Sequence, residues 1–276
     1  MFVSAMNNLS SVSPQGPAVL QGLWDHVRVT HISVLRSPYL PALYAFLTHV
    51  LLCAPFLVLD SLASVSPRVQ SWRIAARSGP PPSLRKWLKC LWRVLFSYTI
   101  AVLPVTALVQ ALRSPRVPEL APTSWRICAD VVSCFLLFDT FFFAWHYAMH
   151  RVPWLYRHVH QTHHQHHIPF ALAAQDANPL ELVSQLVLAL TSAWLLGCHP
   201  LSELIFHLLN SWLAVEVHCG YNLPWTLHRL LPSIVGGAPH HHGHHRQQNG
   251  NFAPYFTHWD RLCGTYRAPV LRKQRK

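Results

Sequence analysis

The stretch that decides the fold covers residues 127–164 and reads ICADVVSCFLLFDTFFFAWHYAMHRVPWLYRHVHQTHH. Its first half, residues 127–145, carries no charge except those of Asp130 and Asp139, and a run of this length can cross a bilayer as a helix. Its second half is crowded with histidines, many of them three or four residues apart. The stretch therefore predicts a membrane helix that leads directly into a metal site at one membrane boundary.

The composition of the whole chain also indicates a membrane protein. Of the 276 residues, 51% are hydrophobic and only 12% are charged, whereas a soluble domain carries about 25% charged residues. The net charge of +12 does not indicate a nucleic-acid surface, because the basic residues lie beside apolar spans and suit anionic lipids instead. The seven cysteines include no CxxC pair, so neither a thiolate zinc site nor a disulfide framework is expected.

Five apolar stretches predict an all-α fold, a multi-pass transmembrane helical bundle. They cover about residues 39–59, 94–112, 127–145, 182–197 and 201–217. The last two are shorter and form either two tilted crossings or a re-entrant hairpin. Pro104 predicts a kink in the second stretch. We expect residues 39–276 to form one membrane domain, preceded by a loose N-terminal arm over residues 1–38.

The distribution of Lys and Arg predicts the orientation of this bundle. Residues 60–93 carry seven of them, which favours the cytosolic side for this segment. That choice puts the N-terminus on the opposite side, and it puts both histidine-rich windows and the C-terminal tail in the cytosol. The sequon Asn8-Leu9-Ser10 would then face the lumen, where Asn8 could carry a glycan.

Three short motifs contain eight of the 21 histidines of the chain. One motif, HxxxH, is followed by two of the form HxxHH. Residues three and four apart share one face of a helix, so we expect each motif to direct its imidazoles at one point. The eight candidate ligands are His146, His150, His160, His163, His164, His241, His244 and His245. Spacing alone also allows a second motif of His163, His166 and His167, and His240 and His242 flank the third motif.

Eight imidazoles are enough for two metal ions with open positions, since one zinc ion takes only three or four protein ligands. A carboxylate-rich centre is disfavoured, because the chain has only ten acidic residues and almost none near the motifs. Imidazole suits iron, which, unlike zinc, has the redox chemistry to activate oxygen. The sequence therefore predicts a histidine-rich di-metal cap that oxidises a bilayer lipid. Asp139, about two turns before His146, either supports a ligand or bonds a neighbouring helix.

These motifs resemble those of the membrane fatty acid hydroxylase and sterol desaturase superfamily. The likeness is strongest over residues 138–267, and the histidine motifs alone identify only the superfamily. The resemblance also selects the motifs that begin at His160 and His241. The stretches that flank the motifs are similar to the branch that hydroxylates cholesterol, and they cover residues 145–150, 152–157, 160–164, 195–200, 220–222 and 251–260.

The resemblance implies a sterol hydroxylase in the endoplasmic-reticulum membrane, with residues 138–267 as its catalytic region and an active site that faces the cytosol. It implies two iron ions and O2 as cofactors, cholesterol as substrate and 25-hydroxycholesterol as product. Electrons would come from NADPH through a partner reductase or a b-type cytochrome. His218 and His228, between the second and third motifs, are further ligand candidates, and His240 is another.

Three positions depart from the family pattern. His242 stands where relatives often carry Asp, while Met149 and Gln247 each stand where a further histidine is expected. A carboxylate lost from beside a metal ligand can lower affinity or activity tenfold or more. The departures leave the substrate and the rate open, although the eight candidate ligands are all present.

Several alternatives remain at this point. Within the family, the reaction could be a desaturation, a C4-methyl oxidation or a fatty acid hydroxylation. Outside it, the histidines could serve a metal transporter, or the chain could be a sterol-binding regulator without activity. A cluster of aromatic residues either lines a lipid path or packs against lipid and protein: Phe141, Phe142, Phe143 and Trp212.

Overall fold

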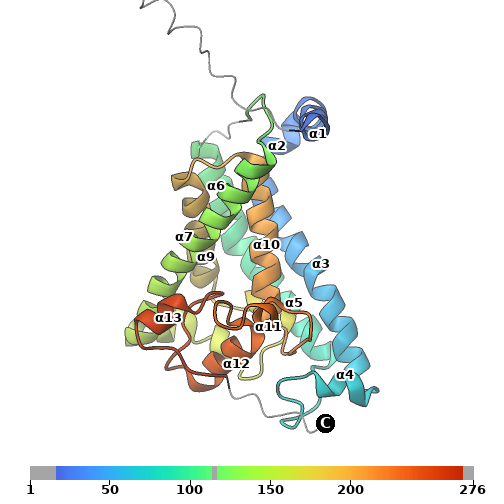
Figure 1. Cartoon of the computed structure of the whole chain (residues 1–276), viewed down its shortest axis with the longest axis vertical. Coiled ribbons are helices and arrows are strands. Elements are labelled where there is room, and N and C mark those ends of the chain that lie inside the picture. Colours follow the sequence, from blue (N-terminus) through green and yellow to red (C-terminus); the bar gives the residue numbers. More distant parts are fainter. Residues whose placement is uncertain (1–16, 114–116, 270–276) are drawn as a thin grey trace, which may run out of the picture.

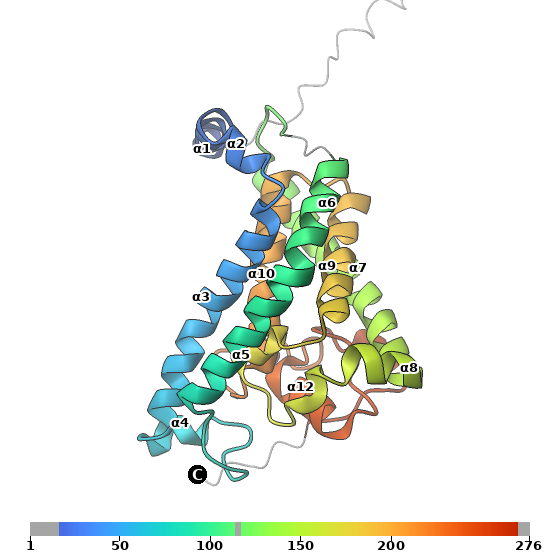
Figure 2. The ribbon, with the colours of Figure 1, turned by 180° about the vertical axis from the view of Figure 1, so that it is seen from behind.

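In the computed structural model, which describes residues 17–113 and 117–269, every regular element is a helix. Long helices run along the long axis of the molecule (Figures 1 and 2). They are α3 (Leu40–Ala63), the continuous α5–η1–α6 (Leu84–Ser97, Tyr98–Val102, Leu103–Arg113), α7 (Ser124–Arg151), α9 (Pro179–Leu195) and α10 (Pro200–His218). The prediction of an all-α bundle is confirmed.

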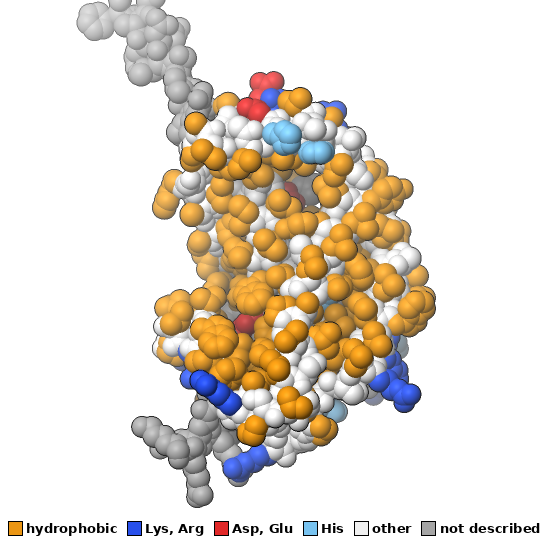
Figure 3. Space-filling view, turned by 90° about the vertical axis from the view of Figure 1, so that its right-hand side faces the viewer, with side chains coloured by type: hydrophobic (Ala, Val, Ile, Leu, Met, Phe, Trp, Pro, Cys, Tyr) orange, Lys and Arg blue, Asp and Glu red, His pale blue; other side chains and the backbone are white. Residues whose placement is uncertain are grey.

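The middle of the bundle is coated with apolar side chains. Three helices, over residues 40–63, 84–112 and 124–151, are long and apolar enough to cross a membrane. Figure 3 shows hydrophobic side chains over the central part of one face, with charged side chains toward the two ends. Leu47, Leu51 and Leu136 are exposed on these helices, which lipid tails accept readily. These features identify a membrane protein.

The fourth and fifth apolar stretches form the helical hairpin α9–α10. α9 leads away from the histidine-rich end of the bundle and α10 returns to it (Figure 1), and both pack against α7. At the turn between them, the His199 ring meets that of Trp24 at 5.0 Å, and His199 Nε2 lies 3.1 Å from the Leu120 carbonyl oxygen. Because the turn reaches the end of the bundle opposite the histidines, the arrangement favours two crossings over a re-entrant hairpin.

The distortion predicted at Pro104 takes the form of a π-helical segment, η1, directly before it. Proline has no N–H and its ring collides with the carbonyl four residues earlier, so a widened turn relieves the clash without ending the helix. The helix that contains it begins at Leu84, ten residues before the predicted span.

The described part of the N-terminal arm is not loose, and that expectation was wrong. Residues 18–30 form α1 (Ala18–Thr30), followed by α2 (Ile32–Leu35). The indole N–H of Trp24, a side chain that is 2% exposed, donates to the Pro118 carbonyl at 2.9 Å and ties α1 to the loop before α7. The spacing of apolar residues in 18–30 carries this signal beneath the Ser and Pro content. Asn8 lies outside the described residues.

Short helices and loops build a cap on one end of the bundle, the lower end in Figure 1. The segment after α3, with α4 (Pro67–Ser71), lies at this same end, as the positive-inside count predicts for residues 60–93 relative to the histidine motifs. The histidine motifs themselves lie at the end of α7 and in the cap. The cap elements are α8 (Pro153–Leu155), η2 (Tyr156–His160), η3 (His163–Gln165), η4 (Ala171–Gln175), α11 (Leu227–Leu230), α12 (Gly237–Gln247) and α13 (His258–Leu262).

Candidate metal centre

The first motif stands on the last two turns of α7. The helix continues six residues beyond the predicted span and carries His146 and His150 four residues apart on one face. It ends because Val152 precedes Pro153 and adopts an extended conformation. The membrane helix therefore delivers its two imidazoles directly into the cap.

The second motif does not lie on a regular α-helix, contrary to the expectation. The π-helical segment η2 ends at His160, and a 3₁₀ turn, η3, begins at His163. The third motif lies on α12, which places five consecutive or nearly consecutive histidines on a single short helix. Both motifs sit in the cap, facing the end of α7.

The nine converging imidazoles form two groups, and the second and third motifs are divided between them. Group 1 consists of His146, His150, His160, His164 and His244. Group 2 consists of His163, His218, His241 and His245. The prediction that each motif directs its imidazoles at one point was wrong for the second and third motifs. On α12, His241 and His245 are four residues apart, differ by about 40° around the helix axis and share group 2. His244 is three residues from His241, differs from it by about 60° in the other direction and belongs to group 1.

The Nε2 atoms within each group touch. In group 1, His160 Nε2 lies 2.9 Å from His146 Nε2, 3.0 Å from His150 Nε2 and 2.9 Å from His164 Nε2. In group 2, His218 Nε2 lies 3.1 Å from His163 Nε2 and 2.9 Å from His241 Nε2. A ring nitrogen carries one hydrogen at most, so it cannot donate to three acceptors. A shared cation explains the convergence.

The spacing of these atoms fits a six-coordinate ion. Metal–nitrogen bonds of about 2.1 Å put neighbouring ligands about 3.0 Å apart in an octahedron and about 3.4 Å apart in a tetrahedron. The closest Nε2 pairs in the two groups range from 2.9 to 3.2 Å. These closest spacings are compatible with an octahedral ion, which is a geometry that iron adopts.

Burial lowers the pKa of the grouped imidazoles in the cap and favours their neutral form. Burial lowers the pKa of His160 and that of His244 to about 3. Burial, followed by the neighbouring imidazoles, holds the pKa of His241 and of His245 well below the usual value. Neutral rings keep a nitrogen lone pair, which is what a metal ligand requires.

Several rings have their outer nitrogen fixed, which leaves Nε2 free to face the group. His146 Nδ1 donates to the Phe252 carbonyl at 2.6 Å, and His244 Nδ1 donates to the Gly250 carbonyl at 2.8 Å. In group 2, only His218 has such a bond, to the Ala214 carbonyl at 2.8 Å. A ring that donates from Nδ1 carries its lone pair on Nε2, so these bonds set the tautomer that binds metal.

Carboxylates surround the centre, although few stand near the motifs in the sequence. Glu181, which is 1% exposed, places Oε1 3.0 Å from His160 Nδ1. The contact is close but is not a hydrogen bond, since His160 Nδ1 has no hydrogen-bond partner and Oε1 accepts from Gln185 Nε2 at 3.2 Å. The expectation that carboxylates lie far from the histidines holds along the chain but not in space.

Asp139 does not touch a histidine ligand. Its Oδ1 accepts the backbone N–H groups of Tyr255 at 3.2 Å and Phe256 at 3.1 Å. It therefore anchors the loop whose Phe252 carbonyl accepts from His146. Neither predicted role is present as stated, because Asp139 contacts no grouped histidine and its bonds go to a loop and not to a neighbouring helix.

Only one of the three additional ligand candidates joins a histidine group. His218 belongs to group 2, whereas His228 and His240 lie in neither group. His228 Nε2 lies 3.0 Å from Asn222 Oδ1, and His240 Nε2 lies 3.5 Å from an Asp260 carboxylate oxygen. On α12, His240 is four residues before His244 of group 1, but its ring lies beside Asp260 instead, whose Oδ1 also accepts the backbone N–H of Phe252 at 2.8 Å.

The three positions that differ from the family pattern also lie outside both groups. His242 is buried but contributes to neither group, Gln247 is exposed, and Met149 fills a fully buried position in the bundle. His166, from the alternative motif, instead contacts Asp176 at 2.7 Å. Although Cys90, His166 and Asp176 could form a third ligand set, Arg93 already binds this carboxylate, and its positive charge opposes a metal ion there.

An apolar cavity runs from the two groups into the bundle. Its volume is about 110 Å³, which is below the roughly 300–1,000 Å³ of most small-molecule sites. Both groups reach it, through His146 and His160 on one side and His163, His218 and His241 on the other. Of the four aromatic residues predicted to line a lipid path or to pack, Phe142 lines the cavity. Phe143 packs on Trp259, Trp212 lies near Phe56, and Phe141 is not part of the lining.

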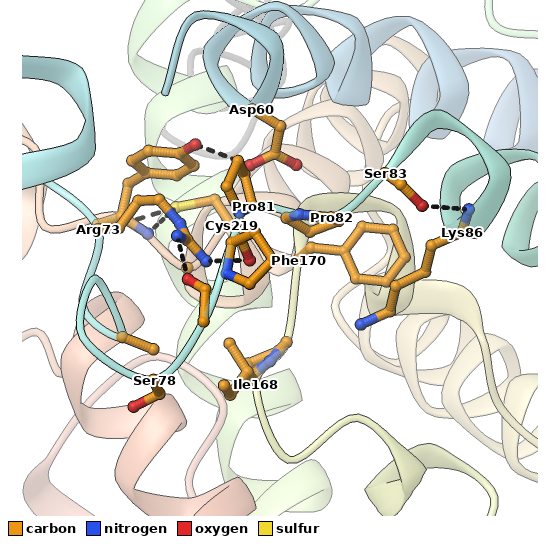
Figure 4. A pocket seen from close by; sticks show the side chains of 16 residues that line it. Asp60, Arg73, Ser78, Pro81, Pro82, Ser83, Lys86, Ile168, Phe170 and Cys219 are labelled. Atoms are coloured by element: carbon orange, nitrogen blue, oxygen red, sulfur yellow. Dashed lines mark hydrogen bonds between the residues drawn. The ribbon is translucent and has the colours of Figure 1, made fainter. Parts of the chain in front are cut away.

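A second cavity opens beside the cap and is separate from the metal centre. Figure 4 shows Asp60, Arg73, Lys86 and Phe170 around it. None of the nine grouped histidines lines it. Its charged groups are used within the protein: Asp60 accepts from Trp87 at 3.0 Å and Tyr221 at 2.7 Å, and Arg73 donates to the Gly79 carbonyl at 2.9 Å.

Comparison with known proteins places this centre in a family. The profile of the family described as "Fatty acid hydroxylase" matches residues 131–265, which contain all nine grouped histidines. "Cholesterol 25-hydroxylase" of Homo sapiens is 44% identical, covering 91% of this chain and 92% of the human protein. The protein of the same name from Rattus norvegicus is 42% identical over 98% of this chain and 91% of its own length.

A fish relative extends the same pattern. "Cholesterol 25-hydroxylase-like protein" of Danio rerio is 40% identical over 89% of this chain and 97% of its own length. No solved structure matches the chain. With identities at this level over nearly whole lengths, the predicted resemblance is confirmed: the chain is a membrane enzyme that belongs to the fatty acid hydroxylase family.

Proposed function

We propose that this protein is an oxygen-dependent sterol hydroxylase that converts cholesterol to 25-hydroxycholesterol. The observation that carries the proposal is the pair of histidine groups beside a largely apolar cavity that both groups help to line. The names of the most similar relatives supply the substrate and the carbon. The cavity has the apolar lining that a sterol tail requires.

The ligand set proposed here is the nine histidines of groups 1 and 2, with two iron ions as the metals. When bound, the iron pair would supply the activation of O2, with electrons from NADPH through a reductase or a b-type cytochrome. The protein would bind the ions, exclude water and orient the lipid. Neutral buried imidazoles hold the ions, and the walls of the cavity exclude water and present one end of the lipid to the centre.

The proposed location is the endoplasmic-reticulum membrane, with the cap in the cytosol and Asn8 in the lumen. Lys and Arg of residues 60–93 support this orientation, because that segment and the histidines lie at one end of the bundle (Figure 2). Under this orientation residues 39–276 form one membrane hydroxylase domain with five crossings. A glycosylated Asn8, detected by glycosidase shift, would support it, and a cytosolic Asn8 would contradict it.

The direct test uses protein purified in detergent, loaded with iron and supplied with NADPH and a microsomal reductase fraction. Incubation with ¹⁸O2 and panels of sterols and fatty acids should yield 25-hydroxycholesterol that carries one labelled oxygen. His163→Ala and His164→Ala should each abolish the product. His167→Ala, in the same tract but exposed and outside both groups, should preserve it.

Each alternative has its own outcome in this test. A desaturated sterol, a C4-oxidised sterol or a hydroxylated fatty acid would assign another reaction of the family. Metal flux across vesicles without oxygen consumption would indicate a transporter. Absence of any product from the iron-loaded protein would indicate a regulator. The buried position of both groups beside a largely apolar cavity is the feature that favours the hydroxylase.

A further inference from the structure

One face of α10 lines the whole length of the cavity. The residues on this face recur at helical spacing, three, four and seven residues apart, and the metal end of the series is His218. The series is His207, Asn210, Ser211, Ala214, Val217 and His218. A single helix thus connects the metal centre with the far end of the cavity.

The middle of this cavity is mostly apolar, with Gln185 of α9 as a polar residue in its lining. Leu182, Leu186 and Ala189 of α9 face it, together with Ala45 of α3 and Val102 of η1. No described charged side chain lines this part, since the nearest carboxylate in the lining, that of Glu181, lies next to His160 at the metal end. A rigid hydrocarbon body between the two ends would therefore meet mainly apolar side chains.

The far end is polar, and its polar atoms have unused hydrogen-bonding capacity. His207 Nε2 is buried without a hydrogen-bond partner, and a Glu203 carboxylate oxygen stands 3.7 Å from it. Ser211 makes no side-chain hydrogen bond to another described residue. Asn210 Oδ1 already accepts from the Tyr255 hydroxyl at 2.9 Å, which holds the amide in place at the cavity wall. Polar groups at this depth in a membrane are costly and usually serve a ligand.

The separation of the two ends suits a sterol lying lengthwise. His218 comes eleven residues after His207 and seven after Ser211, which is about 16 Å and about 10 Å along the helix axis. A sterol carries a single hydroxyl on its first ring and a branched hydrocarbon tail at its opposite end. If the hydroxyl occupies the polar end, the tail is directed at the two histidine groups.

We propose that His207 and Ser211 bind the ring hydroxyl of the sterol, with Asn210 shaping the site, and that this anchor sets which carbon of the tail meets the metal centre. The inference rests on the proposed function and adds the orientation and the specificity site to it. His207 offers either a donor or an acceptor according to its tautomer, and Ser211 offers both, so together they match a hydroxyl group.

The experiment compares cholesterol with its 3-deoxy analogue, 5-cholestene, as substrates of the iron-loaded protein. A site built to bond a hydroxyl discriminates strongly against an analogue that lacks it. We expect kcat/KM for cholesterol to exceed that for the analogue at least tenfold in the unaltered protein. The double variant His207→Leu/Ser211→Ala should bring the ratio close to one and spread the hydroxyl over neighbouring carbons of the tail.

A matched control separates recognition from folding. Ser192→Ala removes a buried hydroxyl of α9 that bonds the Leu188 carbonyl at 2.8 Å and lies outside the cavity lining. This variant should keep the full preference for cholesterol. Ser211→Ala alone, the mildest change, should reduce the ratio severalfold while leaving the iron content and the melting temperature unchanged.

The outcomes distinguish this inference from the proposed function. Oxidation of both sterols at equal kcat/KM by the unaltered protein would overturn the anchor but leave the hydroxylase intact. A preference for cholesterol that survives in the double variant would also overturn it. Failure to oxidise any sterol would overturn both. A double variant that does not fold leaves the unaltered protein and Ser211→Ala as the deciding measurements.

Discussion

The two histidine groups have similar distances between their Nε2 atoms but differ in the partners of their Nδ1 atoms. Group 1 has five imidazoles, and three of them, His146, His160 and His244, face a carbonyl or a carboxylate with Nδ1. Group 2 has four imidazoles, and only His218 has a partner for Nδ1. The remaining three, His163, His241 and His245, have buried Nδ1 atoms without hydrogen bonds, as do two of the five in group 1, His160 and His164.

This difference predicts that the two groups bind their metal ions with different affinities. Outer hydrogen bonds orient ligands and raise their basicity, so the better-supported group is expected to hold its ion more tightly. An octahedral ion would retain one open position in group 1 and two in group 2, given five and four ligands. Group 2 is therefore the more open and more exchangeable of the two, and the predictions below test that asymmetry.

The largest expected effect follows from removing the one well-oriented ligand of group 2. His218→Ala should leave about half of the iron bound and lower product formation by more than about a hundredfold, since losing a ligand exceeds the effect of losing a partner behind it. Metal analysis and product assays measure both. His228→Ala is the control, because His228 also lies between the second and third motifs but joins neither group. Equal losses in the two variants would contradict the grouping.

A smaller effect is expected from the carboxylate behind group 1. Glu181→Gln keeps the size of the side chain but removes the carboxyl group beside His160, and it should lower iron affinity or turnover about ten- to a hundredfold. Glu216→Gln provides a comparison, since this buried carboxylate lies 3.6 Å from His228, which is not in either group. Iron titrations that respond equally to both variants would show that Glu181 acts through general electrostatics rather than through His160.

Much of this arrangement is contained in the sequence. The 127–145 run predicts the helix that carries the first motif, and three- and four-residue spacing predicts the eight motif histidines. These are local properties, fixed by the geometry of one helix. The eight predicted histidines all enter the two groups, although no spacing within a motif reveals that His163 separates from His160 and His164.

The contacts between residues that are distant in the sequence depend on how the helices pack. Glu181 is 21 residues from His160, and Asp139 is 116 residues from the loop that it anchors, so their contacts arise only in the folded bundle. His218 differs from His228 because it ends a long helix that faces the cavity, which sequence spacing does not encode. The one available signal for Glu181 was a carboxylate next to an apolar span, where an unpaired charge is costly.

Acidification should weaken both groups, with iron lost from group 2 first. The pKa of His244 is lowered to about 3 in the fold, against about 6.5 for an unfolded histidine, so between these values only the unfolded chain takes up protons. The contribution of each such residue to stability is therefore present above pH 6.5 and is lost as the pH falls below it, by about 1.4 kcal/mol per pH unit. Melting temperature and iron content between pH 8 and pH 5 measure this. A protein whose stability rises on acidification would refute the neutral, buried state of these rings.

The smallest effect is expected at the position that departs most visibly from the family. His242→Asp restores the carboxylate that relatives often carry, yet His242 contributes to neither group and its Nδ1 has no hydrogen-bond partner. Iron content should be unchanged and product formation should stay within about threefold, as for substitutions that disturb no network. Arg246, one turn along α12, is positioned to compensate the new charge. A gain of tenfold or more would instead mean that the support group 1 receives from Glu181 is incomplete, and that the lost Asp had served the centre through α12.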